Sequence, residues 1–246
     1  MLGNTNIAQL LLNLVAVLVA LTIHEYAHGY AAYKLGDNTA HSLGRLTLNP
    51  IKHLDPFGAL CMLLFHFGWA KPVPINPRNF KNPKRDFAIT AVAGPLTNIV
   101  TSFITAFFLL LANRTFVVTE NEMLYNIQYY TIVFLYLFHL INLGLGIFNL
   151  IPVPPFDGSR ILNAVLPPKL YFKIMKYEQK IYWGVIAWLF LGNYVYAALL
   201  SVPFIAQSAF LSTFARIFSL SDLISSAASW LSGAMLSFWR LLPFLR

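Results

Sequence analysis

The stretch that decides the fold is IAQLLLNLVAVLVALTIHEYAHGYAA, residues 7–32, an apolar run that contains His24, Glu25 and His28. The run is long enough to cross a hydrocarbon core, which takes roughly 20 residues. Ionisable residues inside such a run are costly in lipid and usually serve a function. Residues four apart lie on one face of a helix, so His24 and His28 direct their rings to one place, with Glu25 about a quarter turn away. This spacing suits a Zn²⁺ ion and a nearby base acting on its bound water.

The composition of the whole chain favours a membrane protein. Apolar residues make up 58% of the 246 residues and charged residues only 11%, with a mean hydropathy of +0.63, whereas soluble domains carry about 25% charged residues. Further runs long enough to span a membrane are 88–112, 129–151 and 181–202. The first run is too long for a signal peptide and no Lys or Arg precedes it, so we expect it to stay in the mature protein. We therefore predict an all-α polytopic membrane protein.

The basic residues indicate how the chain lies in the membrane. Lys and Arg are abundant in 33–87 and in 160–180, whereas 112–128 has only Arg114 against Glu120 and Glu122. By the positive-inside rule the first two loops are cytoplasmic and the third is outside, which puts the N-terminus outside. The net charge of +8 is then a sign of topology in a multi-pass protein of the cell membrane. We expect a lipid bilayer as partner and no nucleic acid.

The spacing of the runs predicts two regions. Residues 1–160 form a core with three spanning helices, and residues 161–246 form a C-terminal membrane region in which one further span or interfacial helices follow 181–202. The apolar run 55–69 is shorter than a helix that spans the hydrocarbon core, and it favours a re-entrant or interfacial hairpin. The proline-rich stretch 71–85 cannot be helical throughout, and we predict an extended surface loop there.

Two histidines leave a zinc site incomplete, because catalytic zinc usually has three protein ligands and a water. With Cys61 as the single cysteine, a thiolate cluster within one chain is excluded. The predicted third span ends in NLIPVPPFDG, residues 149–158, where prolines stop the helix and leave Asp157 in irregular backbone near the cytoplasmic face. His24 and His28 lie about 25 Å along the first span at 1.5 Å per residue, near the same face. Topology alone therefore brings Asp157 to the depth of the two histidines.

Taken together, the motifs resemble those of the site-2 protease family of intramembrane zinc metalloproteases. The segments HEYAH, GPLTN and NLIPVPPFDG are similar to the HExxH, G-P-x-x-N and NxxPxPxxDG motifs of the three core helices, at 24–28, 94–98 and 149–158. The stretch GWAKPVP, 68–74, resembles a loop of the compact bacterial members that lack PDZ or CBS domains. The similarity covers roughly residues 7–160.

This resemblance implies an activity and a site. It implies that His24, His28 and Asp157 bind one Zn²⁺ ion per chain and that Glu25 is the catalytic carboxylate. It also implies a substrate that is itself a transmembrane helix, hydrolysed within or near the bilayer. The topology inferred from the basic loops puts the cut near the cytoplasmic face. Such an enzyme is an intramembrane zinc metalloendopeptidase.

Several polar residues of the predicted spans have alternative interpretations. Asn149 and Asn98 are candidates for binding the substrate backbone or the developing oxyanion, and Asn142 lies on nearly the same face as Asn149. Membrane asparagines also join helices by hydrogen bonds, which we favour for Asn98 and Asn142. We expect His66 and His139 to be core or hydrogen-bonding residues rather than ligands.

Two other functions are compatible with a buried His/Glu/Asp cluster. A small transporter or channel could use it as an ion or proton pathway, but polar residues would then recur at several depths, and the sequence has no evident internal symmetry. An inactive scaffold that binds membrane helices has no need for Glu25. Hydrolysis is therefore the favoured interpretation.

Overall fold

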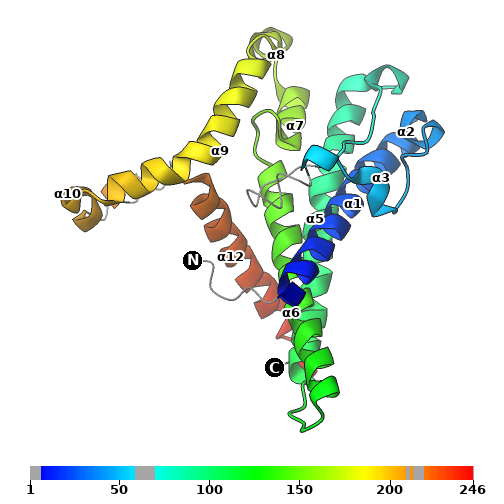
Figure 1. Ribbon diagram of the computed structural model, residues 1–246. Coiled ribbons are helices and arrows are strands. Elements are labelled where there is room, and N and C mark those ends of the chain that lie inside the picture. Colours follow the sequence, from blue (N-terminus) through cyan, green and yellow to red (C-terminus); the bar gives the residue numbers. More distant parts are fainter. Residues whose placement is uncertain (1–6, 59–69, 209–210, 213–218, 246) are drawn as a thin grey trace.

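The computed structural model describes residues 7–58, 70–208, 211–212 and 219–245, and every regular element within them is a helix (Figure 1). The elements are α1 (Ile7–Lys34), α2 (Thr39–Ser42), α3 (Pro50–His53), η1 (Pro77–Asn79), α5 (Pro83–Arg114), α6 (Glu122–Asn149), α7 (Asp157–Val165), α8 (Pro168–Met175), α9 (Glu178–Leu200), α10 (Pro203–Gln207), α12 (Leu220–Trp239) and η3 (Pro243–Leu245). The all-α prediction is confirmed. The predicted hairpin at 55–69 lies largely outside the described residues, as does His66.

Three helices, α1, α5 and α6, pack side by side as the core (Figure 1). Within the described residues these three are long and apolar enough to cross a membrane, and they contain the predicted spans 7–32, 88–112 and most of 129–151. Two of them begin earlier than their apolar runs. Pro83 supplies the first turn of α5, where its missing N–H costs nothing, and the Asn121 side chain caps α6 by accepting from the N–H of Leu124.

Beyond the core, α9 contains residues 181–200 of the predicted fourth span, 181–202, and leads away from the bundle, whereas α12 returns to it (Figure 1). Ala228 and Met235 of α12 pack with Ala106 and Leu143 in one buried cluster. The indole N–H of Trp239 donates to the carbonyl of Phe103 at 2.8 Å. The helix α12 is thus packed on the core; membrane crossing by α9 or α12 and the division at residue 160 stay predictions.

His139 is a hydrogen-bonding residue of the core, as predicted. Its side chain is 1% exposed, with Nδ1 lying 2.8 Å from Oγ of Ser102 on α5 and Nε2 lying 2.8 Å from Oγ of Ser232 on α12. A buried imidazole without partners is costly, and here both ring nitrogens have one, so that these contacts join α6 to α5 and to α12.

Between the end of α3 and η1, residues 71–76 form neither helix nor strand, and their prolines keep this stretch extended. The predicted loop 71–85 is thus confirmed in part, because η1 and the first turn of α5 are helical. Asp37, which is fully buried just after α1, accepts hydrogen bonds from the backbone N–H of Asn76 and the amide of Asn79, both at 2.7 Å, and from Thr39. Asp37 therefore attaches the far end of this segment to α1.

The hydrogen bonds to Asp37 predict a pH dependence of stability. Burial raises the pKa of this carboxyl, but the bonds from Thr39, Asn76 and Asn79 outweigh burial, and the pKa lies below its ordinary value. A carboxyl whose pKa is lower in the folded protein than in the unfolded chain stabilises the fold. This stabilisation is complete at pH values above the pKa in the unfolded chain, and it is lost as the pH falls through the pKa in the folded protein. In Asp37→Asn an amide NH₂ group replaces one carboxylate oxygen and cannot accept these hydrogen bonds. We expect this change to lower the free energy of unfolding by about 1–3 kcal/mol at pH 7.

The check is the thermal unfolding midpoint in detergent as a function of pH. The gap between Asp37→Asn and the native protein should narrow below about pH 4, where the unfolded-state carboxyl is protonated. A gap that stays constant down to the most acidic pH at which the native protein remains folded would contradict this assignment.

Candidate metal centre

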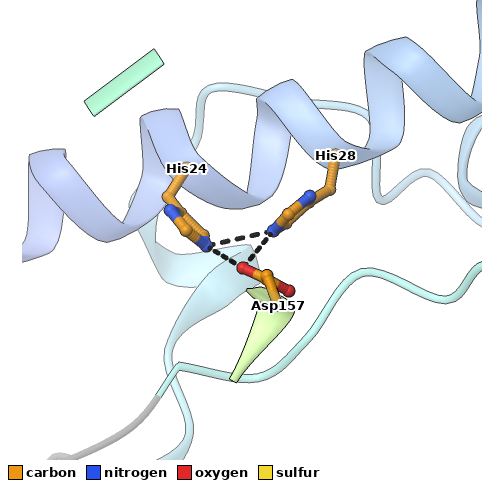
Figure 2. A group of neighbouring side chains, drawn as sticks. All are labelled: His24, His28 and Asp157. Carbon is orange, nitrogen blue, oxygen red and sulfur yellow. Dashed lines mark hydrogen bonds and ion pairs between the residues drawn. The ribbon is translucent and has the colours of Figure 1, made fainter. Parts of the chain in front are cut away.

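Two histidines from α1 meet the first residue of α7 (Figure 2). Nε2 of His24 and Nε2 of His28 each lie 3.1 Å from Oδ2 of Asp157 and 3.0 Å from each other. The residues are buried or nearly so, with His24 5% and His28 6% exposed. Among the residues that the structure describes, these three side chains are the group placed closely enough to hold a metal ion.

The ligand atoms fit one zinc ion. Zinc lies about 2.0–2.1 Å from its nitrogen and oxygen ligands in a tetrahedron, which sets those atoms about 3.3 Å apart, close to the separations of 3.0–3.1 Å. A hydrogen bond at the second ring nitrogen, Nδ1, orients each imidazole. Nδ1 of His24 is 2.5 Å from Oδ1 of Asn98, and Nδ1 of His28 is 2.7 Å from the carbonyl oxygen of Thr90. Both acceptors require the Nδ1–H tautomer, which leaves the Nε2 lone pairs for the metal.

Asp157 is the first residue of a helix, not part of irregular backbone as predicted from the sequence. The prolines do end α6 at Asn149, but irregular backbone extends only to Phe156, after which α7 starts. A carboxylate in a first helical turn is favoured by the unpaired N–H groups there. Gly158 permits the start, because a Cβ at that position would overlap the carbonyl oxygens of Leu150 and Ile151.

The surroundings of Asp157 favour its ionised form. Burial raises the pKa of this carboxyl, but a proton on Nε2 of His24 or His28, the alternative to a metal at that atom, lets the ring donate to the carboxyl and lowers the pKa by more, so that the pKa lies below its usual value. The ionised form is the one that binds a metal.

Gly94 gives the two rings their space. A Cβ built on Gly94 would lie 2.5 Å from Nε2 of His28 and 2.8 Å from Cε1 of His24. The helix α5 therefore approaches α1 at a residue without a side chain, and the two imidazole rings occupy the space.

A cavity of about 560 Å³ is lined by His24, His28 and Asp157. Glu25, half-buried, lines it together with Asn149 and Arg160. Oε2 of Glu25 accepts a hydrogen bond of 2.8 Å from the backbone N–H of Val73 in the extended segment. The guanidinium of Arg160 lies 4.9 Å from the ring centre of Phe87 and adds positive charge to the cavity wall.

The three asparagines have different surroundings. Asn98 is fully buried, with its side-chain oxygen on His24 and its amide donating to the carbonyl of Ala20 at 3.2 Å and to Asn142 at 2.8 Å. Asn149 is at the cavity, and its amide donates to the carbonyl of Leu145 at 3.0 Å. The structure thus brings Asn98 to the back of the metal centre and Asn149 to its open side.

Sequence reasoning missed Thr90, the clearance at Gly94, and Val73. One signal was present for the first two: Thr90, Gly94 and Asn98 are four residues apart, which puts them on one face of α5. No local pattern indicates the contact of Val73 with Glu25, because it joins residues 48 apart in the sequence.

Comparison with known proteins places the chain in a family. Residues 12–192 match the model of Peptidase family M50. The protein named "Putative zinc metalloprotease YwhC" of Bacillus subtilis (strain 168) is 40% identical over 209 residues, which cover 83% of this chain and 91% of the relative.

A second relative is zinc metalloprotease MJ0392 of Methanocaldococcus jannaschii, which is 32% identical over 163 residues. The match covers 66% of this chain and 37% of that longer relative. No solved structure matches the chain. With a buried His/His/Asp centre on helices that can span a membrane, and with this family match, the chain belongs to Peptidase family M50, the site-2 protease family, and is a membrane zinc metalloendopeptidase.

Proposed function

We propose that this enzyme hydrolyses a peptide bond of a transmembrane substrate near the cytoplasmic face, with zinc on His24, His28 and Asp157 and with Glu25 as general base. The observation that carries the proposal is the close triangle of His24 Nε2, His28 Nε2 and Asp157 Oδ2 at a cavity lined by Glu25. A transport pathway for ions or protons accounts neither for this geometry nor for membership of a peptidase family.

The residues of the cavity divide the work of hydrolysis. Bound zinc would supply a Lewis acid that polarises the scissile carbonyl and lowers the pKa of water. Glu25 accepts the proton of the water whose oxygen bonds to the carbonyl carbon, and passes that proton to the amide nitrogen as the C–N bond breaks. Arg160 and Phe87 lie on the wall that the substrate passes.

The asparagines have separate roles in this proposal. Asn98 is a positioning residue. Its side-chain oxygen accepts a hydrogen bond from His24, and its amide nitrogen donates to Ala20 and Asn142 inside the core. Asn149 lines the cavity and is the candidate for contact with the substrate backbone or the oxyanion.

The substrate has to lose helical structure before it is cut. In an intact helix each carbonyl is bonded to the N–H four residues on, so the scissile carbonyl is not free to be polarised. A helix that carries a weak point such as Asn-Gly opens at lower cost. The placement of the N-terminus outside and the site near the cytoplasm rests on the basic loops 33–87 and 160–180.

The function is tested with purified enzyme in vesicles and a panel of single-span reporter proteins, tagged at both ends, with Asn-Gly at different depths of the span. Cleavage of the reporters with Asn-Gly near the cytoplasmic end, measured by fragment mass, is the expected result. Cleavage confined to the opposite end, or to soluble peptides alone, would overturn the proposed site of cutting.

Asp157→Asn should lower the zinc content. An amide is a weaker ligand than a carboxylate and brings no negative charge to the ion, and losing a ligand or its support typically costs 10–100-fold or more in metal affinity. The measurement is zinc per chain after dialysis against a weak chelator. Asp222→Asn, at the start of α12, is the matched control and should keep its zinc; equal zinc in both variants would remove Asp157 from the ligand set.

A further inference from the structure

The extended segment 70–76 contacts α1 at Glu25. Besides the 2.8 Å hydrogen bond from the Val73 N–H to Oε2 of Glu25, the Val73 side chain is buried, at 6% exposed, against Gly29. Gly29 is four residues after Glu25 and so on the same face of α1. A Cβ on Gly29 would lie 3.1 Å from Cγ1 of Val73. The Val73 side chain therefore packs against α1 at a residue that has no side chain of its own.

The near end of the segment is held by Arg45. The guanidinium Nη2 donates to the carbonyl oxygens of Lys71 at 2.8 Å and of Pro72 at 3.2 Å. The N–H of Lys71 also donates to the carbonyl of His53 at 2.8 Å. These bonds fix the two residues directly before Val73.

The far end is held by Asp37, whose carboxylate accepts from the N–H of Asn76 and the amide of Asn79. Val73 thus lies between two attachments, both made by charged side chains that follow α1 in the sequence. Neither Arg45 nor Asp37 lines the cavity, and the hydrogen bonds of the metal ligands go to Asn98, Thr90 and one another.

We infer that the backbone N–H of Val73 orients the Glu25 carboxylate for proton transfer, and that Arg45 and Asp37 are positioning residues that hold Val73 in place. The inference rests on the proposed role of Glu25. A carboxylate on a flexible side chain can turn its oxygens away from the water, whereas one oxygen fixed by a backbone donor leaves the other in a defined direction. Misplacement of a reacting group by about 1 Å can cost on the order of 100-fold in rate.

The effect should fall on turnover and not on metal binding. The segment contacts the base, whereas the zinc ligands are oriented by α5. Loss of the Val73 N–H is therefore expected to lower kcat, with zinc content and KM close to those of the native enzyme.

The experiment compares Val73→Pro with Val73→Ala in the vesicle assay. Both remove the valine side chain, but only proline removes the N–H, and the backbone before Pro74 is already restricted to extended conformations. We expect kcat for Val73→Pro to be about 10–100-fold below that for Val73→Ala, with equal zinc. Equal kcat values would overturn the inference, and a higher kcat for Val73→Pro would overturn it by identifying the contact as one that blocks the base.

If Val73→Pro does not retain zinc or does not fold, the inference is tested by comparing kcat and KM of Arg45→Ala with those of Arg45→Lys in the same vesicle assay. Lysine can still donate to the carbonyl of Lys71 or Pro72, so it should restore part of the kcat lost in Arg45→Ala, with unchanged KM. Failure of lysine to restore kcat, or a loss that appears only in KM, would overturn the inference. Glu25→Gln is run alongside: if it still cleaves, the proposed function fails, whereas an inactive Glu25→Gln with no effect at Val73 or Arg45 rejects only the orienting role.

Discussion

Replacing Glu25 with glutamine is expected to abolish peptide hydrolysis and to leave zinc bound. Glutamine has the size of glutamate and keeps an oxygen to accept the N–H of Val73, but it cannot take a proton from water. General base catalysis typically contributes about 10²–10⁴-fold, so cleavage of the reporter should fall by at least about that factor. The measurements are fragment yield with time and zinc per chain.

The matched control is Glu120→Gln, the same change at an exposed position in the loop between α5 and α6. It should cleave the reporter at the native rate. Cleavage by Glu25→Gln at the rate of this control would show that another group takes the proton, whereas loss of zinc in Glu25→Gln would mean that the side chain supports the metal centre.

Replacing Gly94 with alanine should empty the metal centre. The new methyl group would lie 2.5 Å from Nε2 and 2.6 Å from Cε1 of His28, and 2.8 Å from Cε1 of His24. These distances are well inside van der Waals contact, so the rings or the α5 backbone must move, and the ligand atoms separate. We expect a loss of zinc affinity of at least about 10–100-fold, with a parallel loss of cleavage.

The control is Gly144→Ala on α6, where an added Cβ meets no atom within 4 Å. Alanine favours a helix over glycine by about 1 kcal/mol, so neither variant should fail through weaker helix formation. Native zinc content in Gly94→Ala would mean that α5 can withdraw from α1 without disturbing the ligands, which would contradict the packing described here.

The three-helix core and the family were predictable from the sequence because both depend on local or strongly patterned signals. Long apolar runs predict the spans α1, α5 and α6, since a helix satisfies its own backbone in lipid. The histidines of α1 share a face by their spacing alone. Asp157 followed from topology, and its predicted proximity to both rings agrees with distances of 3.1 Å.

The prediction of irregular backbone at Asp157 was wrong. Asp157 begins α7, although the prolines before it indicated irregular backbone. The helices α5 and α6 extend beyond their apolar runs, because Pro83 and the Asn121 cap start them in polar sequence. A hydropathy pattern follows the membrane boundary, whereas a helix ends where its backbone loses partners.

By itself, the sequence determined that this is a membrane protein, which helix carries the two imidazoles and the carboxylate, and which family the chain belongs to. The tertiary structure alone decided how the imidazoles are oriented, why α5 has a glycine at position 94, and which backbone donor holds Glu25. The physical reason is that hydrophobic pattern and helical spacing act between neighbours in the chain. Ring tautomers, clearances and carboxylate orientation depend instead on atoms brought together from α1, α5 and the segment 70–76 by packing.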